Sequence, residues 1–219
     1  MVQVSRRTGR KGVSGSALIR LLAQLTDTDV PESKQGFADR LSEWLRWTDA
    51  ISLAAALQSG PATAPSGAAA SGSDAEEREC ARVRAALANA IAAESTIGAD
   101  FAAYRRRYHA RQQAMEAAVE PLRARLRAKL AARSPDMARL AAMDAVMEQA
   151  LAAHEHRVLS TVPALLEKHF ERVRQADSEA QPEGWLDAFG KNMQGVLLAE
   201  LDIRFQPVEG LLEALRKRS

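Results

Sequence analysis

The chain has 219 residues, and 47% of them are hydrophobic, which is enough apolar material for one sizeable domain or two small ones. This content excludes wholesale disorder. Aromatic residues make up only 5%, and the abundant Ala, Leu, Arg, Glu, Gln and Met are strong helix formers. No stretch combines β-branched residues with strict alternation, so strands are not expected. We therefore predict an all-α fold.

The cellular location follows from what the sequence does not contain. No run of eighteen apolar residues is present, so no transmembrane helix is predicted. The basic N-terminus is not followed by the apolar core and cleavage site of a secretory signal. The single cysteine, Cys80, excludes an internal disulfide framework and is typical of a reducing compartment. These features predict a soluble cytoplasmic protein, with attachment at the periphery of the inner membrane left open.

Charge is distributed unevenly along the chain, although the formal net charge is only +2. Residues 1–13 carry +4, residues 14–100 carry −5, residues 101–139 carry +7 and residues 140–219 carry −4. A basic middle between two acidic parts can be neutralised inside the fold or by self-association. It does not by itself imply nucleic acid.

The N-terminal part is expected to contain a basic arm and two helices. Residues 1–13 predict a flexible arm, and residues 14–58 predict a small helical hairpin. The first helix begins at a cap, Ser14 or Ser16, and a polar break containing Pro31 separates it from the second. Neither helix alone buries its apolar face, so we expect an antiparallel pair that packs on something else.

The clearest boundary is "SGPATAPSGAAASGS", residues 59–73, which has no charge and no periodicity. Its Gly, Ser, Pro and Ala content predicts a flexible linker. Residues 74–219 are then predicted to form a second domain of long helices.

Residues 74–219 show helical periodicity, interrupted at a few positions. A single helix over residues 74–120 would be about 70 Å long, so a long hairpin, a bundle or a coiled-coil-like arrangement is expected. Gly98 is a weak point in it, and Ser134 followed by Pro135 is a typical helix start. Three prolines carry further expectations: Pro121 kinks or restarts a helix, Pro163 kinks one, and Pro207 ends one.

Four stretches resemble an uncharacterised proteobacterial family, a helical domain of unknown function. They are "LIRLLAQLTDTDVPESKQGFADRLSEWLRWTDAISLAAAL", "YRRRYHARQQAMEAAVEPLRARLRAKLAARSP", "LLEKHFERVRQ" and "LLAELDIRFQPVEGLLEAL". The resemblance implies a cytoplasmic accessory of an envelope complex. It brings no catalytic or binding residues to this chain.

Histidines and acids in "AHEHRVLSTVPALLEKHF" raise the question of a metal site. His154 and His156 are two residues apart, so on a regular helix they face nearly opposite ways. A helical zinc pair needs a spacing of three or four residues, and His169 has no ligand at that distance either. We therefore predict no metal site and interpret these histidines as edges of a helical interface.

Motifs of the common enzyme classes are also absent. Cys80 lacks a CxxC partner and is interpreted as a small apolar packing residue. The sequence has no GxSxG, HExxH, P-loop or GxGxxG motif. We predict no cofactor and no small-molecule substrate, and a non-enzymatic role.

The basic middle is the main candidate for partner binding. Its helix could face an acidic partner helix, lie on acidic lipid or run along a phosphate backbone, or it could be a solvated face whose arginine stems cover apolar surface. Trp47 lies off the main apolar stripe, and core packing is preferred for it over an exposed binding patch. The candidate partner-binding residues are Arg105, Arg106, Arg107, Arg111, Arg123, Arg127 and Trp47.

Long apolar stripes need facing helices to shield them. The sequence therefore predicts an interaction or assembly protein whose stripes pair with copies of itself or with a protein partner. The alternative is weak, sequence-independent association with nucleic acid or acidic membrane through the basic segments.

Overall fold

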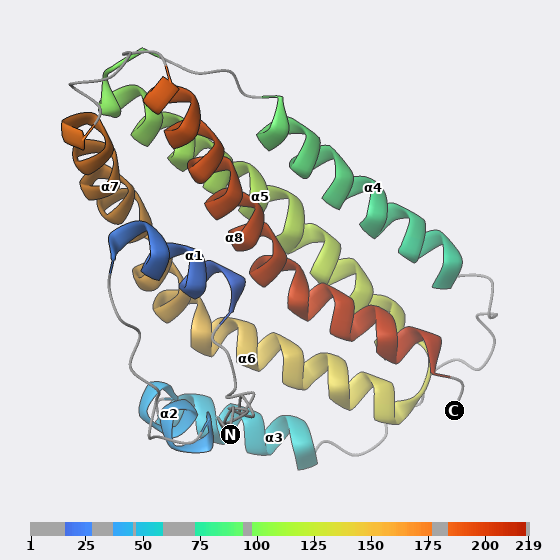
Figure 1. Ribbon diagram of the computed structural model, residues 1–219. Helices are drawn as coiled ribbons and strands as arrows, with labels where there is room; N and C mark the ends of the chain where they lie inside the picture. Colours follow the sequence, from blue (N-terminus) through green and yellow to red (C-terminus); the bar gives the residue numbers. More distant parts are fainter. Residues whose placement is uncertain are drawn as a thin grey trace, which may run out of the picture.

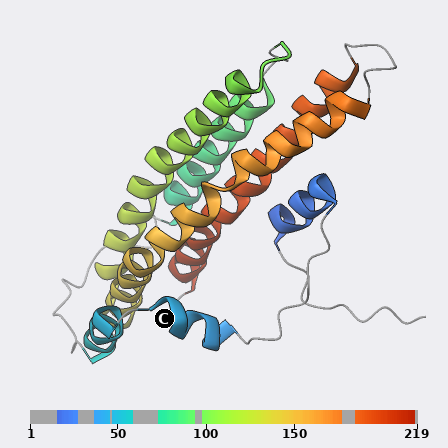
Figure 2. The same cartoon turned by 90° about the vertical axis from the view of Figure 1, so that its left-hand side faces the viewer.

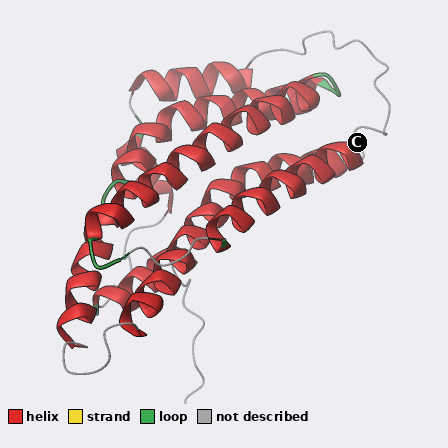
Figure 3. Cartoon of the chain, turned by 90° about the horizontal axis from the view of Figure 1, so that it is seen from above, coloured by secondary structure: helices red, strands yellow, loops and turns green. Residues whose placement is uncertain are grey.

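The computed structural model describes residues 16–27, 37–45, 47–58, 73–93, 98–176 and 184–217. Every regular element in these ranges is a helix, and Figure 3 shows no strand among them. The prediction of an all-α fold is confirmed. The predicted basic arm and nearly all of the predicted linker lie outside the described residues. The helices are α1 (Ala17–Thr26), α2 (Phe37–Trp44), α3 (Trp47–Gln58), α4 (Ser73–Ala92), α5 (Phe101–Ala131), α6 (Pro135–Leu159), α7 (Val162–Ala176) and α8 (Gly184–Arg216).

Three helices begin at side-chain caps. The Ser16 hydroxyl accepts a hydrogen bond from the Ile19 backbone N–H at 3.5 Å, so one of the two predicted caps is confirmed. Ser134 caps α6, and Pro135 follows it as the first helical residue, as predicted. The Asp100 carboxylate accepts from the Ala102 backbone N–H at 3.0 Å and starts α5. Each cap satisfies an N–H group that the helix itself leaves without a partner.

The stretch over residues 74–120 is not one helix, because α4 ends at Ala92 and α5 begins at Phe101. Gly98 lies between them, and the Asp100 cap makes a new helix start favourable. This division allows α4 and α5 to lie side by side instead of extending in one line (Figure 1).

The three prolines behave differently from one another. Pro121 lies inside α5 and does not restart it, and the expectation that Pro207 ends a helix is wrong, since α8 continues to Arg216. The residues after Pro207 keep their apolar face buried, and this burial offsets a proline cost of about 3 kcal/mol. Pro163 lies in the first turn of α7, where a missing N–H costs little, so a break replaces the predicted kink.

The long helices are arranged around α5 and α8. Figure 1 shows these two side by side and running in the same direction, with α4 on one side and α6 and α7 on the other. The contacts of α4 with α8, and of α5 with α6, join segments that run in opposite directions (Figure 1).

The N-terminal helices do not form the predicted hairpin. The sequence predicts a single second helix, but the structure has two helices there, α2 and α3. Both of them pack against α6. Helix α1 instead packs against α7 and α8, and in Figures 1 and 2 it lies away from α2 and α3. The main packing partners of the N-terminal helices are therefore long helices: α7 and α8 for α1, and α6 for α2 and α3.

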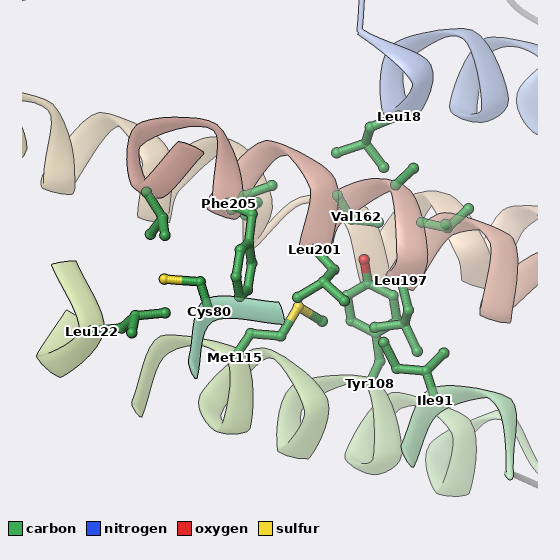
Figure 4. Packing of buried hydrophobic residues seen from close by; sticks show 14 of the residues in the cluster. Leu18, Cys80, Ile91, Tyr108, Met115, Leu122, Val162, Leu197, Leu201 and Phe205 are labelled. Carbon is green, nitrogen blue, oxygen red and sulfur yellow. The ribbon is translucent and has the colours of Figure 1, made fainter. Parts of the chain in front are cut away.

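The core runs along the α5–α8 contact. Figure 4 shows side chains of α4, α5 and α8 meeting there, with Tyr108 of α5 beside Leu197 and Leu201 of α8. At one end of the core an aromatic cluster joins α5, α7 and α8, and its rings contact one another with centroids 4.9–6.2 Å apart. The members of this cluster are Phe101, Tyr104, Phe170, Trp185 and Phe189.

Candidate functional site

Helix α3 presents an apolar side to solvent. The exposed fraction is 80% for Trp47, 53% for Ile51 and 51% for Leu57, and Ala50 and Ala54 between them are also exposed. At about 100° per residue, the positions 47, 50, 54 and 57 fall within an arc of about 80°. We call these five residues the α3 apolar face.

The side of α3 opposite the α3 apolar face is the side that packs against α6. Ala56 is buried and Leu53 is half-buried, and α3 packs against α6. The helix sequence is apolar on both sides, and its one ionisable residue is Asp49. The side with Leu53 and Ala56 faces inward, and the side with Trp47, Ile51 and Leu57 is left outside.

Core packing was the preferred interpretation of Trp47, and the structure shows that it is wrong. The neighbouring Trp44 instead makes the inward contact: its ring stacks on His154 of α6, with centroids 4.0 Å apart and an interplanar angle of 25°. Trp44 is the last residue of α2, whereas Trp47 is the first residue of the separate helix α3, so the two rings do not share one helix face. The third tryptophan, Trp185, is buried in the aromatic cluster.

The predicted basic candidates at the C-terminal end of α5 are engaged inside the chain. Arg123 donates to the Asp144 carboxylate at 2.7 and 2.8 Å. Arg127 donates to Asp144 at 3.0 Å and to Glu148 at 2.6 Å. All four side chains are half-buried, so this network joins α5 to α6 and leaves little of either guanidinium group for a partner.

The N-terminal half of α5 shows a similar pattern. Arg105 pairs with Glu167 of α7 and lies over the Phe101 ring, with its guanidinium carbon 5.4 Å from the ring centroid. Arg106 is exposed, whereas Arg107 and Arg111 are half-buried. The basic middle is thus neutralised in large part by acidic side chains of its own chain, which is one of the two alternatives that the charge pattern left open.

A buried polar cluster that the sequence analysis missed lies between α5 and α8. The fully buried Glu200 carboxylate accepts a hydrogen bond from the Tyr108 hydroxyl at 2.6 Å and from the Gln112 amide at 3.2 Å. Arg204 donates to the same carboxylate at 3.0 Å, and its guanidinium lies 3.6 Å from Glu155. Burial and the Glu200 charge raise the pKa of Tyr108, so its hydroxyl stays a donor.

The cluster could have been found from periodicity. Glu200 lies three and four residues after Leu197 and Val196, so it falls on the buried stripe of α8, and Arg204 follows at the spacing of an ion pair. A carboxylate there needs partners from the facing helix. Since Tyr108, Gln112 and Arg204 satisfy it, the cluster fixes the register of α5 against α8.

His169 of α7 is buried where α1 meets α7 and α8. Its Nε2 lies 2.9 Å from the Asn192 amide, and its Nδ1 lies 3.2 Å from the Arg172 guanidinium. Arg172 also donates to the Leu25 carbonyl at the end of α1. Burial, followed by the positive charge of Arg172, lowers the pKa of His169.

We expect this lowered pKa to make the protein less stable in acid. Between the folded pKa of His169 and the unfolded value of about 6.5, the unfolded chain binds more protons. The contribution of His169 to the free energy of unfolding therefore falls as pH drops below about 6.5 and levels off below the folded pKa. Urea unfolding from pH 7.5 to 5.0 measures this slope, which His169→Gln is expected to reduce and the exposed control His156→Gln is expected to keep. Equal slopes in all three proteins would contradict it.

Other candidate centres have structural explanations. Burial raises the pKa of Cys80 to about 11, so the thiol stays protonated at neutral pH and packs in the core. Within the described ranges, no three His, Cys, Asp or Glu side chains are grouped so that they could hold a metal ion. The helices of these ranges also include none with the length and apolarity to cross a membrane.

The described helices define an all-α protein whose long helices carry three short N-terminal ones. A family model described as a protein of unknown function (DUF3348) matches residues 1–217, and the chain belongs to this family. The resemblance to an uncharacterised family is thereby confirmed at that level. Neither a curated protein nor a solved structure matches the chain.

Proposed function

We propose that this chain is a non-enzymatic helical interaction or assembly protein that binds a protein partner through the α3 apolar face. The observation that carries the proposal is Trp47, a large aromatic side chain that is 80% exposed and continuous with Ile51 and Leu57. Aromatic side chains of this kind are common anchors in protein interfaces, and a contiguous apolar patch rimmed by polar surface typically marks a binding site.

The chemistry of the face agrees with a helical partner. It contains no ionisable side chain, so it offers nothing to hold a phosphate group or a charged substrate. A row of apolar side chains on one helix instead fits the apolar stripe of another helix. The cytoplasmic accessory role in an envelope complex, implied by the family resemblance, belongs to this proposal as one setting for such a partner.

The alternative function, weak association with nucleic acid or acidic membrane, draws less support from the geometry. It needs arginines that face solvent; Arg106 does, whereas Arg123 and Arg127 are half-buried and pair with acidic side chains of α6. Breaking those pairs to reach a phosphate would forfeit contacts that the fold already makes.

A photo-crosslinking amino acid at position 47 tests the proposal. We expect irradiation in native cells to give discrete adducts from position 47 and none from the matched position 81, an exposed alanine on α4, the helix that packs on α8 and α5. Adducts are detected as shifted bands and identified by mass spectrometry. If position 47 gives no adduct, or the same adducts as position 81, the α3 apolar face is not the binding surface.

A further inference from the structure

We infer that the partner on the α3 apolar face is a second copy of this chain, with the two α3 helices antiparallel about a two-fold axis. The inference rests on the proposed function and names its partner. It is argued from four properties of the face: its spacing, its shape, its lack of charge and its area.

The spacing between the residues of the face is the same whether it is counted from the N-terminal or the C-terminal end of α3. Trp47, Ala50, Ala54 and Leu57 are separated by three, four and three residues. When two such helices run in opposite directions about a dyad at the level of residue 52, Trp47 lies beside Leu57 of the other copy. Ala50 lies beside Ala54 in the same way. A two-fold interface requires a patch that complements itself, and this order of residues does so.

The shape of the face suits close packing. Ala50 and Ala54 lie near the dyad with Ile51 at one edge of the face, and Trp47 and Leu57 lie at the two ends. Small residues at the crossing point let two helices approach at the short end of the usual 8–10 Å interaxial range. Positions 47 and 57 lie on opposite flanks of the arc, so the two rings and the two leucines interdigitate instead of colliding.

Charge also favours a second copy. An identical partner brings an identical patch, and the absence of ionisable groups on the face means that no like charges meet across the dyad. The formal net charge of the whole chain is only +2, so long-range repulsion between copies is small.

The area of the face sets the strength that we expect. From the exposed fractions, the five side chains offer roughly 450 Å² per copy, about half of the roughly 800 Å² that a standard stable interface buries on each partner. The dimer is therefore reversible, and its population depends on protein concentration in the micromolar-to-millimolar range.

Sedimentation of the purified full chain from about 5 to 500 µM tests the dimer over that range. We expect the average mass to rise from one chain toward two. Ala54→Glu places a charge at the centre of the face, and we expect it to weaken association at least ~10-fold. The matched Ala81→Glu on α4 keeps the wild-type behaviour, and circular dichroism checks that both variants stay helical. A single-chain mass for the wild type at every concentration would overturn the inference.

A disulfide experiment tests the antiparallel arrangement. Chains carrying Ala50→Cys are mixed with chains carrying Ala54→Cys and a larger tag, under mild oxidation. We expect the mixed disulfide to form faster than either self-disulfide, because only positions 50 and 54 are adjacent across the dyad. Faster self-disulfides of either variant would overturn the antiparallel pairing.

The crosslinking experiment separates this inference from the proposed function. An adduct from position 47 that contains two copies of this chain supports both. An adduct with a different protein keeps the proposed function and overturns the second copy as partner. No adduct overturns both.

Discussion

Glu200→Ala is expected to lower the free energy of unfolding by about 3–5 kcal/mol, because it removes one partner of a buried ion pair and leaves the rest uncompensated. The Tyr108 hydroxyl would lose its acceptor, and Arg204, itself mostly buried, would lose its closest carboxylate. Gln112 keeps a contact with the Leu159 carbonyl at 3.2 Å, so it loses less. Urea unfolding followed by circular dichroism measures the change.

Two variants show whether the buried position is the cause. Glu155→Ala removes the other acidic neighbour of Arg204, but Glu155 is exposed, so the change is expected to stay below about 1 kcal/mol. Combining Glu200→Leu with Tyr108→Phe and Arg204→Leu removes every strong polar partner together. It is expected to recover much of the stability, since an apolar replacement can be neutral or better. A loss of less than about 1 kcal/mol for Glu200→Ala would show that the cluster does not hold α5 to α8.

Phe189→Ala is the other change with a large expected effect, a loss of about 3–5 kcal/mol in the free energy of unfolding. The Phe189 ring is fully buried, and its centroid lies 5.0 Å from that of Tyr104 and 4.9 Å from that of Phe170. It also contacts Phe101 and His169, so its removal opens a cavity shared by α5, α7 and α8. Thermal and urea unfolding measure the loss.

A matched substitution on the same helix provides the control. Leu198 is more than one-third exposed, and Leu198→Ala is expected to change the free energy of unfolding by less than about 1 kcal/mol. Equal losses from Phe189→Ala and Leu198→Ala would contradict the placement of the aromatic cluster in the core.

Local sequence signals predicted helix content and some helix starts well. The caps at Ser16 and Ser134 depend on a side chain and an N–H group three residues away, so the information lies within one turn. The prolines were harder, because their effect depends on context. Pro207 could continue α8 only because the residues beyond it find a buried place on other helices, and this is a tertiary property.

For the candidate sites, too, the sequence predicted some features, and others depended on the tertiary structure. The sequence indicated that Trp47 lies off the main stripe, but the same pattern agreed with burial and with exposure. The basic middle was visible as a charge excess, yet its neutralisation depended on where α6 and α7 placed Asp144 and Glu167. Glu200 lay on a recognisable stripe, and what remained unknown was which side chains of α5 would face it.

From the amino-acid order alone follow the all-α class, the capped starts of α1 and α6, and the alternation of basic and acidic parts along the chain. The tertiary structure decided which side of α3 is left in solvent, that α1 packs on α7 and α8, and that the arginines of α5 meet carboxylates of neighbouring helices. The physical reason is range: caps and propensities act within a few residues, whereas burial and ion pairing depend on residues far apart in the chain that only folding brings together.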